Sequence, residues 1–126
     1  MKNLEGKRAI LYRRVSTTDQ KDFGNSLSEQ KNRLRDYCSS NQVLNVREFE
    51  EDFSAKNFNR PEFIKLLEYA TKNKNEIDLL LVHKWDRFSR NELEGLQMLE
   101  VFKRLNIEVN SIDQWIDHND QTQKMM

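Results

Sequence analysis

Residues 77–82 read IDLLLV, and the polar segment HKWDRFSRN follows directly at residues 83–91. A short run that is almost entirely apolar is typical of a central strand in a parallel sheet, because such a strand is buried on both faces. Residues 9–15 open with a similar run, AILY, which leads into the polar segment VSTTDQKDFGN at residues 15–25. The sequence therefore predicts two buried strands, each followed by a loop rich in polar residues.

Helical and extended patterns alternate around these two strands. Ser26 opens a Ser-x-x-Glu capping box, which predicts the start of a helix that ends near residue 40. Residues 43–49 predict a strand, and Pro61 fits the first turn of a second helix. The remaining apolar periodicity predicts a helix and a last strand, over residues 92–105 and 107–111.

This alternation predicts a single α/β domain, a three-layer sandwich with a mostly parallel central sheet of four or five strands. Functional sites in such folds form beyond the carboxyl ends of the strands. The loops after the first and third strands begin at Arg14 and His83. We therefore expect the polar residues of these two loops to meet at one edge of the sheet.

Composition narrows the class of protein. The chain has 126 residues, 33% of them charged, which fits one globular domain. Cys38 is the single cysteine, and the sequence contains neither a signal-peptide pattern nor an apolar run of the roughly 20 residues that a membrane span needs, so we expect a cytoplasmic protein without disulfides. The formal net charge is zero, whereas nucleic-acid-binding modules are usually basic. The charges are unevenly spread, however, with basic residues dominating positions 1–21 and acidic residues clustered at positions 48–52.

The two polar loops carry a serine and several arginines. Ser16 lies two residues after Arg14, and Arg87 and Arg90 lie in the other loop. A serine hydroxyl is a poor nucleophile unless its surroundings activate it, and phosphoryl transfer depends on positioning and on stabilising the charge of the phosphate oxygens. Guanidinium groups can supply that charge, because they stay protonated and offer forked donors that match phosphate oxygens. This combination predicts a phosphoryl-transfer centre that needs no metal ion and no cofactor.

Each of these residues also has a structural interpretation. Ser16 could cap a turn, and Arg87 and Arg90 could form a solvated helix start. Asp86 could be a helix cap or an ion-pair partner. The acidic residues at positions 48–52 could belong to a metal nuclease, but acidic runs are usually solvated faces and no second acidic cluster is obvious to complete such a site.

Four segments resemble the serine recombinases, the resolvase and invertase family of site-specific recombinases. YRRVSTTDQ at residues 12–20 resembles the N-terminal signature of that family, and KWDRFSRN at residues 84–91 resembles its second signature. SLSEQ at residues 26–30 and NRPEF at residues 59–63 match in type and order. The resemblance covers about residues 8–116 and implies a resolvase-like catalytic domain that cuts and rejoins DNA in site-specific recombination.

The resemblance implies a role for each matching position. Ser16 would attack the DNA phosphodiester, form a 5′-phosphoserine link and release a 3′ hydroxyl. Arg14, Arg87 and Arg90 would bind the scissile phosphate and stabilise the transition state, with Arg87 helping the leaving oxygen. Other residues would orient the arginines, complete the pocket or support it: Asp86, Gln20, Arg60, Ser54 and Lys84.

The chain departs from the family pattern at three positions. Ala55 stands where a glycine is common, and Trp85 and Phe88 replace commoner aliphatic residues. In the family, a long dimerising helix and DNA-binding domains follow the catalytic domain. We therefore expect residues 1–126 to be a catalytic domain truncated before those parts, inactive in recombination by itself. The expected partners of the full-length protein are double-stranded DNA and further copies of itself, in a dimer and a tetrameric synapse, with no membrane involved.

Other functions remain open at this point. A serine transposase would use the same chemistry. A non-catalytic flavodoxin-like or receiver-like signalling domain would carry clustered acids after the first strand, where this sequence has arginines. A structural DNA-binding module would not need Ser16.

Overall fold

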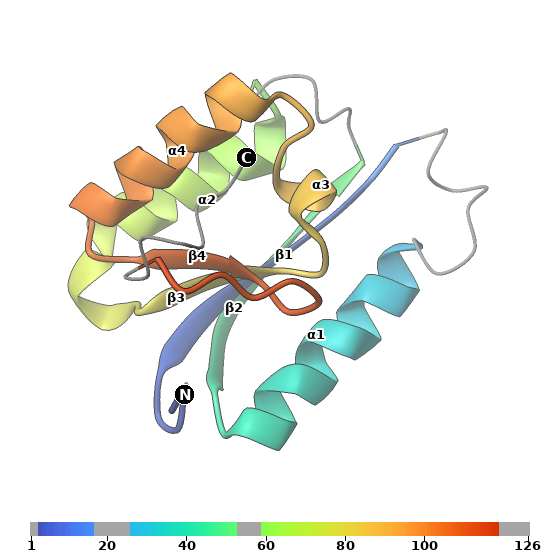
Figure 1. Ribbon diagram of the computed structural model, residues 1–126, viewed down its shortest axis with the longest axis vertical. Coiled ribbons are helices and arrows are strands. Elements are labelled where there is room, and N and C mark those ends of the chain that lie inside the picture. The colour runs from blue at the N-terminus through green and yellow to red at the C-terminus, as the bar shows by residue number, and fades with distance from the viewer. Residues whose placement is uncertain (1–2, 17–25, 53–58, 119–126) are drawn as a thin grey trace.

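The computed structural model describes residues 3–16, 26–52 and 59–118 and contains a parallel sheet (Figure 1). The four strands lie in the order β2-β1-β3-β4, and every neighbouring pair is parallel. Their bounds are β1 Arg8–Val15, β2 Leu44–Asp52, β3 Leu79–Val82 and β4 Glu108–Ser111. The predicted α/β class and parallel sheet are confirmed, with the two apolar runs forming the adjacent central strands β1 and β3.

Helices cover both faces of this sheet (Figure 1). Helix α1 (Leu27–Asn41) lies on one face, and α2 (Pro61–Lys72) and α4 (Glu92–Arg104) lie side by side on the other. A short 3-10 helix (Lys74–Glu76) follows α2, and the four-residue helix α3 (Trp85–Phe88) follows β3. The three-layer sandwich is therefore present in the described part of the chain.

Alternation along the central strands divides the core in two. On the α1 side, Ala9 and Leu11 of β1 pack with Leu34 and Cys38 of the helix. On the other side, the next residues along the strand join a larger cluster with α2 and α4, which includes Ile10, Tyr12, Leu80, Val82, Phe63, Leu66 and Phe102. Because side chains alternate across a strand, neighbouring residues of β1 serve different layers.

The helix ends follow the predicted local signals. Ser26 caps α1 by accepting a hydrogen bond from the amide of Glu29 at 3.1 Å, and Pro61 is the first residue of α2. The side chain of Asn91 caps α4 in the same way, through the amide of Glu94 at 3.1 Å. Within the described residues, no helix is long and apolar enough to cross a membrane.

Candidate active site at the carboxyl edge of the sheet

Arg14 joins the end of β1 to the segment that follows β3. Its side chain is 0% exposed, with Nε donating to the carbonyl oxygen of Arg87 at 3.1 Å and Nη2 donating to that of Asp86 at 2.8 Å. The predicted meeting of the two polar loops at one edge of the sheet is thus confirmed for Arg14, Asp86 and Arg87.

Arg87 of α3 in turn donates a hydrogen bond to the backbone of β1. Its Nη1 donates to the carbonyl oxygen of Arg14 at 3.2 Å, and its Nε donates to Oδ1 of Asp86 at 3.0 Å. The guanidinium is buried, whereas Asp86 is exposed. Asp86 therefore bonds the guanidinium of Arg87 from the solvent side.

Arg60 enters the same region from the start of α2. It is 0% exposed, and it donates to the hydroxyl of Tyr12 at 3.1 Å and to the carbonyl oxygen of Phe88 at 2.6 Å. Its guanidinium also lies 5.7 Å from the centre of the Tyr12 ring and 5.2 Å from that of Phe63. Arg60 is thus a buried cation that links α2 to the end of α3.

A buried carboxylate completes this arrangement. Glu51 accepts hydrogen bonds from the Tyr12 hydroxyl at 3.1 Å and from the amides of Glu62 and Phe63, at 3.1 and 2.8 Å. These amides belong to the first turn of α2, where an acidic group is favourable to the helix dipole. Glu51 therefore fixes the start of α2 next to Arg60. It also holds the Tyr12 hydroxyl, which accepts a hydrogen bond from Arg60.

Burial governs the ionisation of this cluster. Desolvation lowers the pKa of Arg60, an effect that the nearby Tyr12 and Glu51 oppose. Desolvation also raises the pKa of Tyr12 well above its ordinary value. Tyr12 consequently stays protonated, so its hydroxyl can donate to Glu51 while accepting from Arg60.

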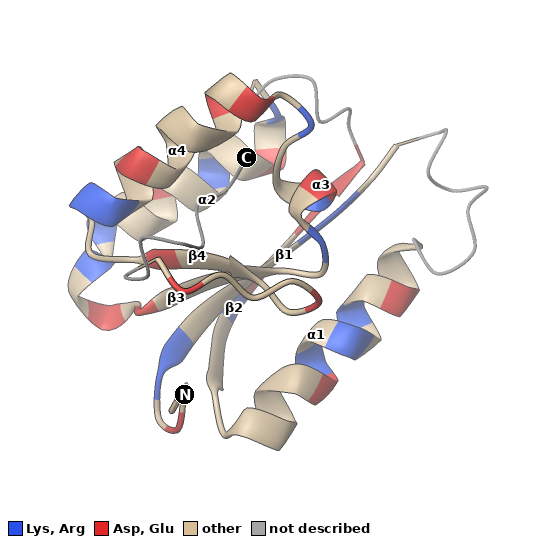
Figure 2. Cartoon of the chain, in the orientation of Figure 1, with Lys and Arg blue, Asp and Glu red and all other residues tan. Residues whose placement is uncertain are grey.

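The remaining predicted site residues lie around this cluster or outside the described residues. Ser16 follows the last residue of β1 and is partly exposed, next to the Arg14 connection. Lys84 and Arg90 are exposed on either side of α3. Gln20 and Ser54 lie outside the described residues. Figure 2 shows basic residues at the carboxyl end of β1 and on α3, at the same edge of the sheet.

Sequence reasoning missed three residues that organise this edge: Gln30, Tyr12 and Glu51. Gln30 of α1 is 0% exposed and accepts from the amide of Arg14 at 3.1 Å while donating to its carbonyl oxygen at 2.8 Å. Spacing could have revealed two of them, because Gln30 shares the buried helical face of Leu34 and Cys38, and Glu51 shares the buried strand face of Phe49.

The acidic residues of β2 form ion pairs and hydrogen bonds within the fold. Arg13 donates to Glu48 and, at 2.9 Å, to Glu50, while Arg35 donates to Glu48 at 2.8 Å. Glu51 faces the opposite layer from Glu48 and Glu50 and is bonded as described above. Among the described residues, no three His, Cys, Asp or Glu side chains gather in a way that could hold a metal ion.

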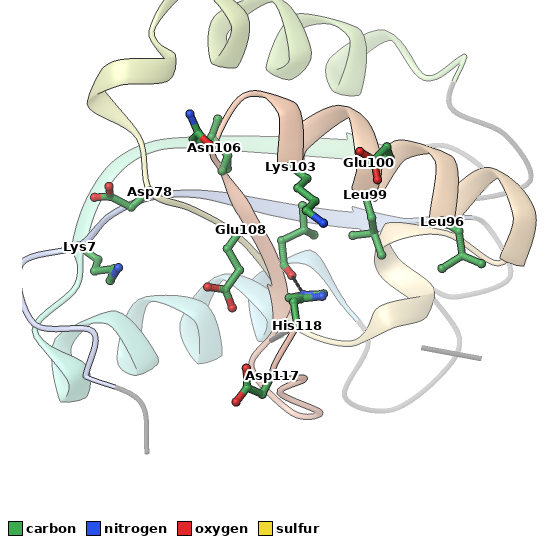
Figure 3. Close-up of a pocket in the computed structure, with 12 residues that line it drawn as sticks. Lys7, Asp78, Leu96, Leu99, Glu100, Lys103, Asn106, Glu108, Asp117 and His118 are labelled. Atoms are coloured by element: carbon green, nitrogen blue, oxygen red, sulfur yellow. Dashed lines mark hydrogen bonds between the residues drawn. The ribbon is translucent and has the colours of Figure 1, made fainter. Parts of the chain in front are cut away.

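A hollow of about 560 Å³ lies away from the arginines, beside β4 and α4 (Figure 3). Its lining mixes both charges and includes Lys7 and Asp78, which precede β1 and β3 at the amino ends of the strands. Ligands of parallel α/β folds bind beyond the carboxyl ends instead. The arginine cluster is therefore the better candidate for an active site.

The class of protein that emerges is a parallel α/β domain with buried arginines at the carboxyl edge of its sheet. The family model described as "Resolvase, N terminal domain" matches residues 9–126, so the chain belongs to the resolvase family of serine recombinase catalytic domains. The comparison with curated proteins finds no match.

Solved structures agree with this assignment. The N-terminal catalytic domain of TP901-1 integrase is 30% identical, with a TM-score of 0.80 over 92% of this chain and 85% of that one. A resolvase family site-specific recombinase from Streptococcus pneumoniae is 27% identical, with a TM-score of 0.76 over 92% and 79%. The C-terminal catalytic domain of ISC1926 TnpA, an IS607-like serine recombinase, is 25% identical, with a TM-score of 0.72 over 85% and 70%.

Proposed function

We propose that this domain breaks and rejoins DNA strands by transesterification, with Ser16 as the nucleophile. The observation that carries the proposal is the cluster of Arg14, Arg60 and Arg87, buried at the edge where β1 ends and Ser16 begins the loop. The three guanidinium groups bring positive charge and forked donors to one edge of the sheet, which favours a site for an anion. Family membership identifies DNA as the anion to test first.

The reaction balances without an external reagent. The Ser16 hydroxyl gives up its proton, and its oxygen attacks the phosphorus of the scissile phosphodiester. The bond from phosphorus to the 3′ oxygen breaks, and that oxygen leaves as a 3′ hydroxyl after taking up a proton. The 5′ phosphate stays on Ser16, and the reverse attack by a 3′ hydroxyl rejoins the strand without ATP, because the phosphodiester's energy is retained.

The arginines divide the electrostatic work in this proposal. Arg14 and Arg87 are held by carbonyl oxygens, so their positions are set before DNA arrives, and such preorganised charge stabilises a transition state without reorganisation. Arg90 and Lys84 are exposed and would reach phosphate from the rim. Asp86 would keep Arg87 oriented, and Arg60 would complete the pocket together with Gln20 and Ser54.

The wider proposal follows from the family resemblance. The partners are double-stranded DNA and further copies of the protein, which pair the cleaved strands. The chemistry uses no metal ion and no nucleotide cofactor. DNA cleavage by the full-length protein should therefore persist in excess chelator. Strict dependence on a divalent ion would contradict this part of the proposal.

The test captures the covalent intermediate without knowledge of the DNA target. The tagged full-length protein is expressed in its host. It is then denatured in detergent and purified, and the DNA attached to it is sequenced. The wild-type protein should carry DNA joined through a 5′ phosphate, and mass spectrometry after nuclease digestion should find the modification on Ser16.

Ser16→Ala should abolish the adduct while leaving DNA binding nearly unchanged, because the substitution removes the nucleophile and none of the arginines. Thr71→Ala is the matched control, since it removes a hydroxyl bonded within α2, to the Leu67 carbonyl oxygen at 2.7 Å. A Ser16→Ala protein that still accumulates covalent DNA would eliminate Ser16 as the nucleophile.

A further inference from the structure

Ser89 forms a clamp across Arg90 in the connection between α3 and α4. The amide of Ser89 donates to the carbonyl oxygen of Trp85 at 3.0 Å, which ends α3. Its hydroxyl donates to the carbonyl oxygen of Asn91 at 2.8 Å and accepts from the amide of Asn91 at 3.0 Å. Both peptide groups of Asn91 are therefore bonded to one side chain on the other side of Arg90.

Gly95 forms the seat for this clamp on α4. Its amide donates at 2.8 Å to the carbonyl oxygen of Asn91, the same oxygen that accepts from the Ser89 hydroxyl. A Cβ at Gly95 would lie 3.3 Å from the Cβ of Ser89 and 3.5 Å from its Oγ. Gly95 is buried inside the helix, where glycine is otherwise unfavourable, so its presence is explained by the close approach of Ser89.

Arg90 lies within this arrangement, between Ser89 and Asn91. Arg14, Arg60 and Arg87 are buried and bonded to carbonyl oxygens of α3 or β1, whereas Arg90 is exposed. The backbone of a residue sets the direction in which its side chain leaves the main chain. That backbone is fixed on one side by Ser89 and on the other by Asn91, the cap of α4.

We propose that Ser89 and Gly95 are positioning residues for Arg90, acting as a clamp and its seat. This inference rests on the proposed function, in which Arg90 contacts the scissile phosphate. A methyl group at Gly95 would push Ser89 away by a few tenths of an ångström, and the backbone of Arg90 would move with it. Small misplacements of groups around a reacting centre lower the rate of the chemical step more than they change binding.

The test is a double-mutant cycle of Gly95→Ala and Ser89→Gly, measured as single-turnover cleavage of the duplex recovered by adduct capture. Gly95→Ala should slow cleavage about 5- to 20-fold with little change in the Kd for DNA. In the Ser89→Gly background, where the clash partner is gone, the same substitution should slow cleavage less than about twofold. Gln97→Ala is the control, since Gln97 lies exposed on the same helix.

The cycle separates positioning from a general structural effect. The slowing caused by Gly95→Ala in the wild-type background is divided by the slowing it causes in the Ser89→Gly background. A ratio above about twofold supports the proposal, because the added methyl group then acts through Ser89. A ratio below about twofold overturns it, whether Gly95→Ala slows both backgrounds equally or neither.

Hydrogen exchange of the Asn91 amide, measured on this chain, distinguishes failure of this inference from failure of the proposed function. Both single substitutions should speed exchange at Asn91, because its amide is bonded to the Ser89 hydroxyl. Faster exchange with unchanged cleavage by a Ser16-dependent enzyme would overturn the positioning role alone. Cleavage that does not need Ser16 would overturn the proposed function, and unchanged exchange would overturn the clamp.

Discussion

Arg13 and Arg14 are neighbours on β1, yet the protein treats their charges in different ways. Arg13 points to the α1 layer, where its guanidinium meets the carboxylates of Glu48 and Glu50. Arg14 points to the α3 layer, where the hydrogen bonds described above lead to the carbonyl oxygens of Asp86 and Arg87. Adjacent residues of one strand therefore sit in an ion-pair network and in a candidate active site.

The difference lies in what each kind of partner does to the charge. A carboxylate cancels the charge of a guanidinium, whereas a carbonyl oxygen orients the group and leaves its full positive charge in place. Around Arg13, two arginines and two glutamates balance in charge, whereas the bonds of Arg14 given above go to neutral carbonyl oxygens. In the proposed function, this distinction is the reason why a phosphate binds at the carboxyl edge and not beside Arg13.

The largest expected effect breaks this comparison at Arg14. Arg14→Lys should lower the rate of DNA cleavage about 10²- to 10³-fold, because an ammonium group cannot keep both carbonyl contacts and also present a fork to phosphate. Arg13→Lys is the matched control and should stay within about threefold of the wild-type protein. Single-turnover cleavage assays on the captured duplex measure both, and thermal unfolding verifies that each variant is folded.

Equal losses in the two variants would contradict the distinction between the two arginines. In that event, general disturbance of β1 would explain both results, and the carbonyl-bonded arginine would hold no special place in the chemistry.

A smaller effect is expected at the hydroxyl that joins Glu51 to Arg60. Tyr12→Phe keeps the ring, which packs at 5.3 Å against Phe63, but leaves a buried carboxylate and a buried guanidinium each short of one bond. The free energy of unfolding should fall by about 1–3 kcal/mol, measured by urea denaturation of this chain. Tyr69→Phe, whose ring lies 6.1 Å from Phe49, is the control and should change stability by less than about 0.5 kcal/mol.

A Tyr12→Phe protein as stable as the wild type would show that Glu51 and Arg60 find other partners. Glu51 would then act only as the cap of α2 and not as part of the support for Arg60.

The fold was predictable because its two central strands are almost purely apolar and its helices begin with recognisable caps. The end of β2 was not, since the sequence predicts a strand over residues 43–49 and the structure continues it to Asp52. Residues 50–52 are all acidic, and their extension comes from pairing with Arg13, Arg14 and Val15 of β1. Such pairing is a tertiary interaction that overrides local preference.

The sequence predicted only those features of the site that follow from the geometry of parallel strands. Parallel strands bring their carboxyl ends together, which sufficed to join Arg14 to Arg87. The burial of Arg60 depends on Tyr12, Phe63 and the carbonyl oxygen of Phe88, which come from β1, α2 and α3. No local pattern in the sequence specifies that three elements will close around one guanidinium.

The smallest expected effect tests whether the ion pair between Arg13 and Glu48 stabilises the fold. Burial alone would raise the pKa of Glu48, but hydrogen bonds from Asn45, Arg13 and Arg35 outweigh it, and the pKa is lowered below its ordinary value of 4.5. A carboxyl group whose pKa is lower in the folded state stabilises the fold fully above its unfolded pKa and loses that contribution as the pH falls through the folded pKa. The wild-type protein should thus be more stable than Glu48→Gln by up to about 1 kcal/mol at pH 7, and the difference should shrink between about pH 5 and pH 3.

Urea denaturation at a series of pH values measures this difference. Arg35→Met removes one of the three donors, which leaves the pKa of Glu48 closer to its ordinary value, so the loss of stability should be smaller than in the wild type and complete at a higher pH. A difference between the wild type and Glu48→Gln that stays constant down to pH 3 would mean that the fold does not favour the charged carboxylate. The contrast between Arg13 and Arg14 would then rest on the ion pair of Arg13 with Glu50.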